Sequence, residues 1–154
     1  MTTLPPQQIQ LVTSTWARVA PSAPAVAALF YERLLTLDPQ LKPLFKGDMV
    51  AQGGKLMEMI GAAVGLLNRP AVLTPVLRNL GRRHQGYGVV DAHYEVVGQA
   101  LLQTLEAGLG EAFTTSVRSA WTAVYGALAQ QMKAGAEMPQ ATPAIRVTPL
   151  QFAN

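Results

Sequence analysis

Apolar residues recur at steps of three and four along most of this chain, which is the spacing of one face of an α-helix. The steps do not continue as a heptad, so a coiled coil is not expected. We predict an all-α fold with six or seven helices of unequal length. The main apolar stripes place helices at about residues 6–19, 24–37, 50–68, 73–84, 91–107 and 113–132.

Glycines and an aspartate mark particular positions in this pattern. The predicted helix over residues 50–68 contains four glycines. A glycine inside a helix costs up to about 1 kcal/mol relative to alanine, so this number suggests close helix–helix contacts. Gly86 and Gly88 are expected to end the helix before them, and Asp91 is expected to cap the next helix.

The composition limits the chemistry that the chain can support. Hydrophobic residues make up 49% of its 154 residues and charged residues only 14%, so apolar side chains are numerous enough to line a pocket as well as fill a core. The chain has no cysteine, which excludes disulfides, iron–sulfur clusters, thiolate haem ligation and cysteine zinc sites. His84 and His93 are the only histidines, and a cofactor held by a single histidine suits this composition.

Charge and hydropathy argue against several partners. The net charge of +3 by itself permits nucleic-acid binding, but Arg82–Arg83 is the only adjacent basic pair and no aromatic or groove-reading motif accompanies it, so we expect no nucleic-acid interface. No apolar run approaches the roughly 20 residues that a membrane-spanning helix needs. The first residues lack the basic and apolar regions of a signal peptide, and we expect a cytoplasmic protein that does not bind membranes.

His84 is the leading candidate for a metal ligand. It lies four residues after Leu80, one turn further along the same predicted helix face. Its Nδ1–H can donate to a carbonyl one turn back, while Nε2 points away as a ligand, as in a proximal haem histidine. The alternative is a histidine near a helix C-terminus that interacts only with the helix dipole. His93 lies nine residues after His84, and we expect the corner between them to place it on the wrong side to bind the same metal.

The composition changes near residue 137. Proline and small residues dominate residues 138–143, which is typical of a linker, and residues 145–148 alternate weakly like a short strand. We therefore predict one domain over residues 1–136 and a flexible tail or linker over residues 137–154.

Several segments, in this order and spacing, resemble the globin family. The chain is most similar to bacterial single-domain haemoglobins, to the globin domains of flavohaemoglobins and to neuroglobin-like members, over about residues 7–135. The resemblance implies a globin fold, a three-over-three helical sandwich, with haem b bound and His84 as the iron ligand. The matching segments are Leu29-Phe30-Tyr31, Asp38-Pro39, Pro39 to Phe45, Leu80 to His84, Tyr87 to Tyr94, Val97 to Leu102 and Ala120 to Gly126.

The same resemblance assigns a distal pocket, where a gas would lie. It implies that Tyr31 and Gln52 contribute hydroxyl and amide donors, that Leu56 is the apolar residue over the iron and that Phe45 stacks on the haem. From the residues alone, Gln52 could instead be a solvent-facing glutamine near a helix start, and Phe45 an ordinary core residue.

Further positions around the cofactor follow from the resemblance. Ala27 and Gly53 correspond to the close crossing of the second and third long helices. Other residues are expected at the haem edge or on the proximal side, although exposed cations are commonly just solvated. These residues are Lys55, Leu80, Arg82, Arg83, Tyr87, Val90 and Tyr94.

The chain departs from the family at one proximal position. Some bacterial members complete a network of histidine, tyrosine and glutamate; the tyrosine is Tyr94, but the glutamate position falls on Ala136, next to Glu137. A weaker network would make His84 less electron-rich, which lowers the expectation of peroxidase-like or dedicated dioxygenase chemistry.

The resemblance to globins implies reversible binding of dioxygen, nitric oxide or carbon monoxide, for transport or storage. One alternative is a nitric oxide dioxygenase that works with a separate reductase. Another is a fragment of a globin-coupled sensor. We expect a monomer or a weak homodimer.

Overall fold

The computed structural model describes residues 4–45 and 47–137, and these residues form helices joined by short turns. No strand occurs among the described residues, so the all-α prediction is confirmed. The α-helices are α1 (Pro6–Val19), α2 (Ala23–Leu37), α3 (Met49–Gly65), α4 (Pro70–Gly86), α5 (Asp91–Leu109) and α6 (Thr115–Ala136), with 3-10 helices η1 (Ala20–Ser22), η2 (Pro39–Leu44) and η3 (Gly110–Ala112).

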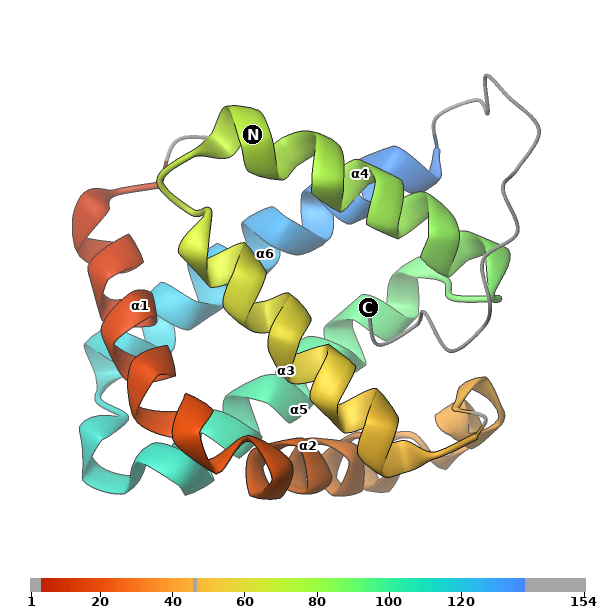
Figure 1. Cartoon of the computed structure of the whole chain (residues 1–154), viewed down its shortest axis with the longest axis horizontal. Helices are drawn as coiled ribbons and strands as arrows, with labels where there is room; N and C mark the ends of the chain where they lie inside the picture. Colours follow the sequence, from red (N-terminus) through yellow and green to blue (C-terminus); the bar gives the residue numbers. More distant parts are fainter. Residues whose placement is uncertain (1–3, 46, 138–154) are drawn as a thin grey trace.

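The helices pack in two crossed layers around a main apolar core, and a smaller buried cluster is formed by Val89, Tyr94 and Ala129. Figure 1 shows α3 crossing in front of α5 and α6, with α4 above and α2 below. α4 makes its most extensive contacts with α6, and α2 packs against both α3 and α5. Trp121 of α6 is buried against Trp16 of α1, and its indole N–H donates to the Thr15 hydroxyl at 2.9 Å. This bond satisfies a buried polar atom and ties the first helix to the last.

Side-chain caps fix the start of several helices, but the start of α5 differs from the prediction. Asp48 accepts a hydrogen bond from the Val50 N–H and so caps α3. At α5 the N-cap residue is Val90, and Asp91 is already the first helical residue. The prediction that Asp91 caps this helix is therefore wrong. The Val90 N–H instead donates to His93 Nδ1 at 3.1 Å.

Two of the four glycines in α3 lie at close helix contacts. A Cβ on Gly53 would lie 2.9 Å from Ala27 Cβ, which confirms the predicted crossing of α2 and α3. A Cβ on Gly61 would lie 3.3 Å from Trp16 Nε1, whereas Gly54 and Gly65 face open space. The prediction of close contacts thus holds for Gly53 and Gly61 only.

The corner between α4 and α5 depends on one glycine. Gly88 has a φ of +96°, a backbone conformation that residues with a side chain rarely adopt. Gly86 is the last residue of α4 and has no positive φ. Gly88 alone therefore supplies the unusual backbone that we expected from both.

Two further expectations concern the C-terminal tail and the crossing of a membrane. The proline-rich tail and the possible strand over residues 145–148 lie outside the described residues. None of the helices that the structure describes is both long and apolar enough to cross a membrane.

Candidate functional site

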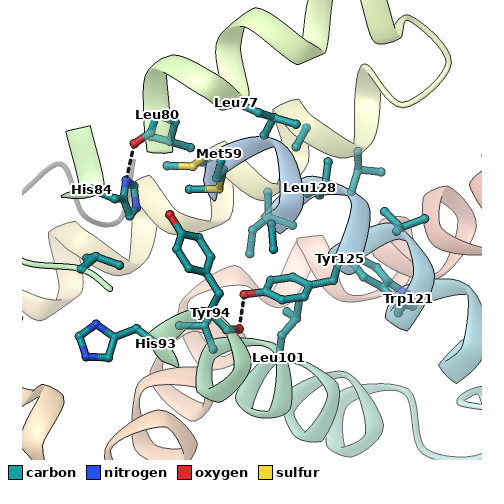
Figure 2. Close-up of a pocket in the computed structure, with 18 of the residues that line it drawn as sticks. Met59, Leu77, Leu80, His84, His93, Tyr94, Leu101, Trp121, Tyr125 and Leu128 are labelled. Atoms are coloured by element: carbon teal, nitrogen blue, oxygen red, sulfur yellow. Dashed lines mark hydrogen bonds between the residues drawn. The ribbon is translucent and has the colours of Figure 1, made fainter. Parts of the chain in front are cut away.

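A cavity of about 140 Å³ lies between α3, α4, α5 and α6. Figure 2 shows its labelled lining residues converging from these helices. The wall is almost entirely aliphatic and aromatic, and the titratable groups in it are two histidines and two tyrosines: His84, His93, Tyr94 and Tyr125. An apolar cavity with few polar groups is typical of a site for a cofactor or small ligand.

His84 lies in the last turn of α4 and is only 6% exposed. Its Nδ1 lies 2.8 Å from the carbonyl oxygen of Leu80, as drawn in Figure 2. A carbonyl can only accept, so Nδ1 carries the proton and the lone pair is on Nε2. This is the tautomer and the orientation that a histidine metal ligand needs.

His93 also lines the cavity, contrary to our expectation that the corner would place it on the wrong side. Its Nδ1 accepts the hydrogen bond from the Val90 N–H. A backbone N–H can only donate, so the neutral ring carries its proton on Nε2. The two histidines at this corner therefore have opposite tautomers.

Two tyrosines stabilise the wall opposite His84. The Tyr125 hydroxyl donates to the Tyr94 carbonyl oxygen at 2.6 Å, and Gly98 leaves room for the Tyr125 ring. Burial, and to a smaller extent the charge of Asp91, raises the pKa of Tyr94 to about 12. Burial likewise raises the pKa of Tyr125.

Sequence reasoning missed Tyr125, because its contact with Tyr94 joins residues 31 positions apart and no local pattern indicates it. The cation near Tyr94 is also unexpected: Lys133 Nζ lies 5.5 Å from the centre of its ring. Ala136, which takes the proximal glutamate position in the resemblance to globins, is the last residue of α6, and the neighbouring Glu137 is exposed.

Tyr31, Phe45 and Gly53 form a second cluster, where α2 meets η2 and α3. The Tyr31 and Phe45 rings pack edge to face, with the ring centres 5.3 Å apart, and Gly53 lies beside the Tyr31 ring. The Tyr31 hydroxyl is buried and has no hydrogen-bond partner in the part of the chain that the structure describes. Burial raises the pKa of Tyr31 well above its usual value.

Gln52 lies beside this cluster and is only 1% exposed. The alternative of a solvent-facing glutamine is therefore wrong. Glutamine side chains are mostly exposed in proteins, so the burial of Gln52 is unusual.

Several residues assigned to the haem surroundings do not line the cavity. Val90 is 55% exposed, and its neighbour Val89 lines the cavity in its place, which corrects the expectation for Val90. Leu80 and Tyr94, which were expected on the proximal side, both line the cavity. The remaining assigned residues lie outside the lining, and all are partly buried: Phe45, Lys55, Leu56, Arg82, Arg83 and Tyr87.

Tyr87 and Arg82 have a feature in common with Tyr31. The Tyr87 hydroxyl and Arg82 Nε are buried, and neither has a hydrogen-bond partner within the described ranges. The Tyr87 ring centre lies 6.2 Å from that of His84, which places Tyr87 at the corner next to the candidate ligand. Most buried polar groups in proteins are hydrogen-bonded, so these two atoms are exceptions that the described residues do not explain.

Comparison with known proteins identifies the family. A family model for globins matches residues 28–132. The chain belongs to the globin family. The structure is similar to that of an engineered carbene transferase from Rhodothermus marinus, named RmaNOD, with a TM-score of 0.78 and 25% identity over 87% of this chain and 94% of that one. This agreement confirms the globin fold.

Two groups of relatives resemble this globin over most of its length. It is 33% identical over 139 residues to neuroglobin of Danio rerio, covering 81% of this chain and 87% of that protein. It is 32% identical over 127 residues to the flavohemoprotein of Vibrio cholerae, covering 80% of this chain and 32% of that protein. The globin thus spans about a third of the length of the flavohemoproteins that it matches.

Globins bind haem and small gaseous ligands, and the cavity of this globin fits such a cofactor. Its wall is apolar, His84 presents the required tautomer, and Arg82 and Tyr87 at the corner offer unsatisfied polar atoms to a charged edge. A porphyrin has an apolar face, which suits the apolar wall, and charged propionates, which suit the unsatisfied polar atoms.

Proposed function

We propose that this globin holds haem b through Nε2 of His84 and reversibly binds dioxygen and other small gases such as nitric oxide and carbon monoxide. The observation that carries the proposal is the hydrogen bond from His84 Nδ1 to the Leu80 carbonyl, in the wall of an apolar cavity. The bond fixes the ring and places the lone pair on Nε2. When bound, the haem iron supplies the coordination site at which a diatomic gas is held.

The walls of the cavity support this role by excluding water. Met59 of α3, Leu101 of α5 and Leu128 of α6 face His84 across the cavity in Figure 2. Burial of apolar porphyrin surface against such side chains contributes about 25 cal/mol per Å². A dry environment also strengthens every hydrogen bond made inside it.

We assign the distal pocket to Tyr31, Gln52 and Leu56, with Phe45 stacking on the haem. The support is the buried Tyr31 hydroxyl, which has no partner among the described residues, and the 1% exposure of Gln52. Leaving a buried polar group unsatisfied costs about 1–3 kcal/mol, so a polar ligand at this hydroxyl would be stabilised. The raised pKa of Tyr31 keeps it a hydrogen-bond donor.

We assign the haem edge to Lys55, Arg83 and Tyr87, together with Arg82. These residues would pair with the propionates as cations and as a hydroxyl donor. Because Lys55 and Arg83 are partly exposed, each pair contributes little, typically below 1 kcal/mol.

Titration of the purified apoprotein with haem tests the proposal. We expect saturation at one haem per chain, with a Soret absorption band typical of a histidine-ligated globin. Continued growth of a broad free-haem band without a sharp end point would contradict it. The matched control is the same titration with protoporphyrin lacking iron, which probes the cavity without His84 ligation.

A second candidate function is nitric oxide dioxygenase activity with a separate reductase. It is favoured by the flavohemoprotein relatives and by RmaNOD, which has been provisionally described as a nitric oxide dioxygenase. The same residues would serve. Turnover of nitric oxide to nitrate with an added reductase would distinguish it from simple gas binding. A sensor role would require an output domain in the full-length protein.

A further inference from the structure

α4 and α6 contact each other through their backbones at two glycines. A Cβ on Gly81 of α4 would overlap the carbonyl group of Met132 on α6. A Cβ on Gly135 of α6 would overlap the carbonyl group of Arg78 on α4. Both glycines are buried, and in both cases the obstructing atoms are backbone rather than the end of a flexible side chain.

The contact is reciprocal, because each helix offers one glycine to one carbonyl of the other. Arg78 and Gly81 lie one turn apart on α4, and Met132 and Gly135 lie one turn apart on α6. Arg78 Nε also donates to Gln131 Oε1 at 3.1 Å, which opposes sliding of one helix along the other. We call this contact the α4–α6 seat; it consists of Arg78, Gly81, Gln131, Met132 and Gly135.

The seat lies directly beside the His84 ligand position. Gly81 follows Leu80, whose carbonyl holds His84 Nδ1, and it precedes His84 by a single turn. Met132 of the seat also lines the cavity. A helix moves as a stiff body over one turn, so any change in the separation of α4 and α6 moves the Leu80 carbonyl and the His84 ring together.

We propose that Gly81 and Gly135 are positioning residues, which set how far His84 Nε2 reaches into the cavity by allowing α4 to lie directly on α6. A binding group must be held within roughly 0.5 Å of its productive position, and a backbone displacement caused by one methyl group exceeds this tolerance. The effect on haem rests on the proposed function, but the seat is a property of the polypeptide alone.

The chain supplies a matched control for this proposal. Gly126 lies in the same helix, α6, and a Cβ there would have no contact within 4 Å. Gly126→Ala therefore makes the same chemical change without disturbing the seat. Alanine also has the higher helix propensity, so the control variant is expected to be at least as stable as the parent.

The experiment compares Gly81→Ala, Gly135→Ala and Gly126→Ala in the full chain. In the ferrous haem form, resonance Raman spectroscopy measures the iron–histidine stretching band, and transfer to an excess of apomyoglobin measures the rate of haem loss. In the apoprotein, hydrogen exchange measures protection of the backbone amides of α4, a readout that needs no haem. Thermal unfolding of the apoprotein shows whether each variant is folded.

We expect Gly81→Ala and Gly135→Ala to shift or broaden the iron–histidine band, to speed haem loss roughly tenfold to a hundredfold and to lower protection in α4, with no change for Gly126→Ala. Lower thermal stability with an unchanged band and an unchanged rate of haem loss would overturn the positioning role. If the parent binds no haem, the proposed function fails. Unchanged amide protection of α4 in Gly81→Ala and Gly135→Ala would then separately show that the α4–α6 seat does not determine the position of α4.

Should both seat variants fail to fold, Gln131→Met provides a milder test. It removes the hydrogen bond to Arg78 and keeps a side chain of similar size. A smaller shift of the iron–histidine band would support the proposal, whereas an unshifted band in the folded protein would overturn it.

Discussion

His84 and His93 lie on opposite sides of the same corner and line the same cavity, yet their rings are held in opposite ways. His84 Nδ1 donates to the Leu80 carbonyl at the end of α4. His93 Nδ1 accepts from the Val90 N–H at the start of α5. In the neutral rings, the lone pair of His84 is therefore on Nε2. The lone pair of His93 is on Nδ1, where it accepts the hydrogen bond from the Val90 N–H.

The position of each histidine in its helix explains the difference. The side chain of His84 leans back toward the preceding turn of α4, where Leu80 offers a carbonyl oxygen, so the bonded nitrogen must carry the proton. His93 lies in the first turn of α5, where the N-cap residue Val90 offers an N–H group, so the bonded nitrogen must accept. At this corner the fold makes one histidine suited to binding a metal and the other suited to capping a helix.

The largest effect is expected from removing each histidine in turn. His84→Ala should abolish stable haem binding or leave the haem weakly held, because the only Nε2 lone pair contributed by the two histidines is lost. His93→Ala should retain a histidine-ligated spectrum. Absorption spectra of both variants after reconstitution with haem measure this difference. The assignment fails if His84→Ala keeps the normal spectrum while His93→Ala loses it.

A smaller effect is expected on the opposite side of the cofactor. Tyr31→Phe and Gln52→Leu should each increase the dioxygen dissociation rate by about tenfold to a hundredfold, because a hydrogen bond to a strongly polar acceptor contributes roughly 1.5–3 kcal/mol. Carbon monoxide carries less charge when bound, so its release should change much less. Flash photolysis and stopped-flow measurements give both rates. Equal changes for the two gases would indicate altered access rather than a lost hydrogen bond.

The capping role of His93 predicts a modest loss of stability. His93→Ala removes the acceptor for the Val90 N–H and should lower the free energy of unfolding by about 1 kcal/mol, the usual net contribution of one hydrogen bond. Urea unfolding of the apoprotein measures it. His93→Asn, which keeps a short polar acceptor, should retain part of this stability. Equal stability of the parent and His93→Ala would show that the cap contributes nothing.

The smallest effect is expected at Asp91, which lies in the first turn of α5 without being its N-cap. Asp91→Asn removes a charge that interacts with the helix dipole, a contribution of about 0.3–1 kcal/mol. The same change should lower the pKa of Tyr94 from its value of about 12, because the Asp91 charge helps to raise it. Ultraviolet titration of the tyrosines measures the pKa shift. A loss of stability larger than that of His93→Ala would restore Asp91 as the cap.

The sequence predicts the parts of this molecule that depend on local spacing. The helices follow from apolar steps of three and four, the Leu80–His84 bond follows from a separation of one turn, and the crossing at Ala27 and Gly53 is present as the family resemblance implies. The distal roles of Tyr31, Gln52 and Leu56 remain predictions. The domain boundary near residue 136 also remains a prediction.

The features that sequence reasoning did not find depend on the path of the corner or on distant segments. The turn at Gly88 decides whether Val89 or Val90 faces the cavity and brings His93 back toward it. Neither outcome is encoded in helix periodicity, because the corner is not helical. The Tyr125–Tyr94 bond and the α4–α6 seat join segments that lie tens of residues apart, so only the packed structure reveals them.

The absorption spectrum of the ferrous protein, recorded without added ligand, tests most directly that His84 alone of the two histidines holds the iron. The opposite tautomers predict a five-coordinate, high-spin iron, which gives a single broad visible band. A sharp, split, low-spin visible pattern would show that a second side chain binds the iron. Loss of that pattern in His93→Ala would identify His93 as the second ligand and contradict the division of roles between His84 and His93.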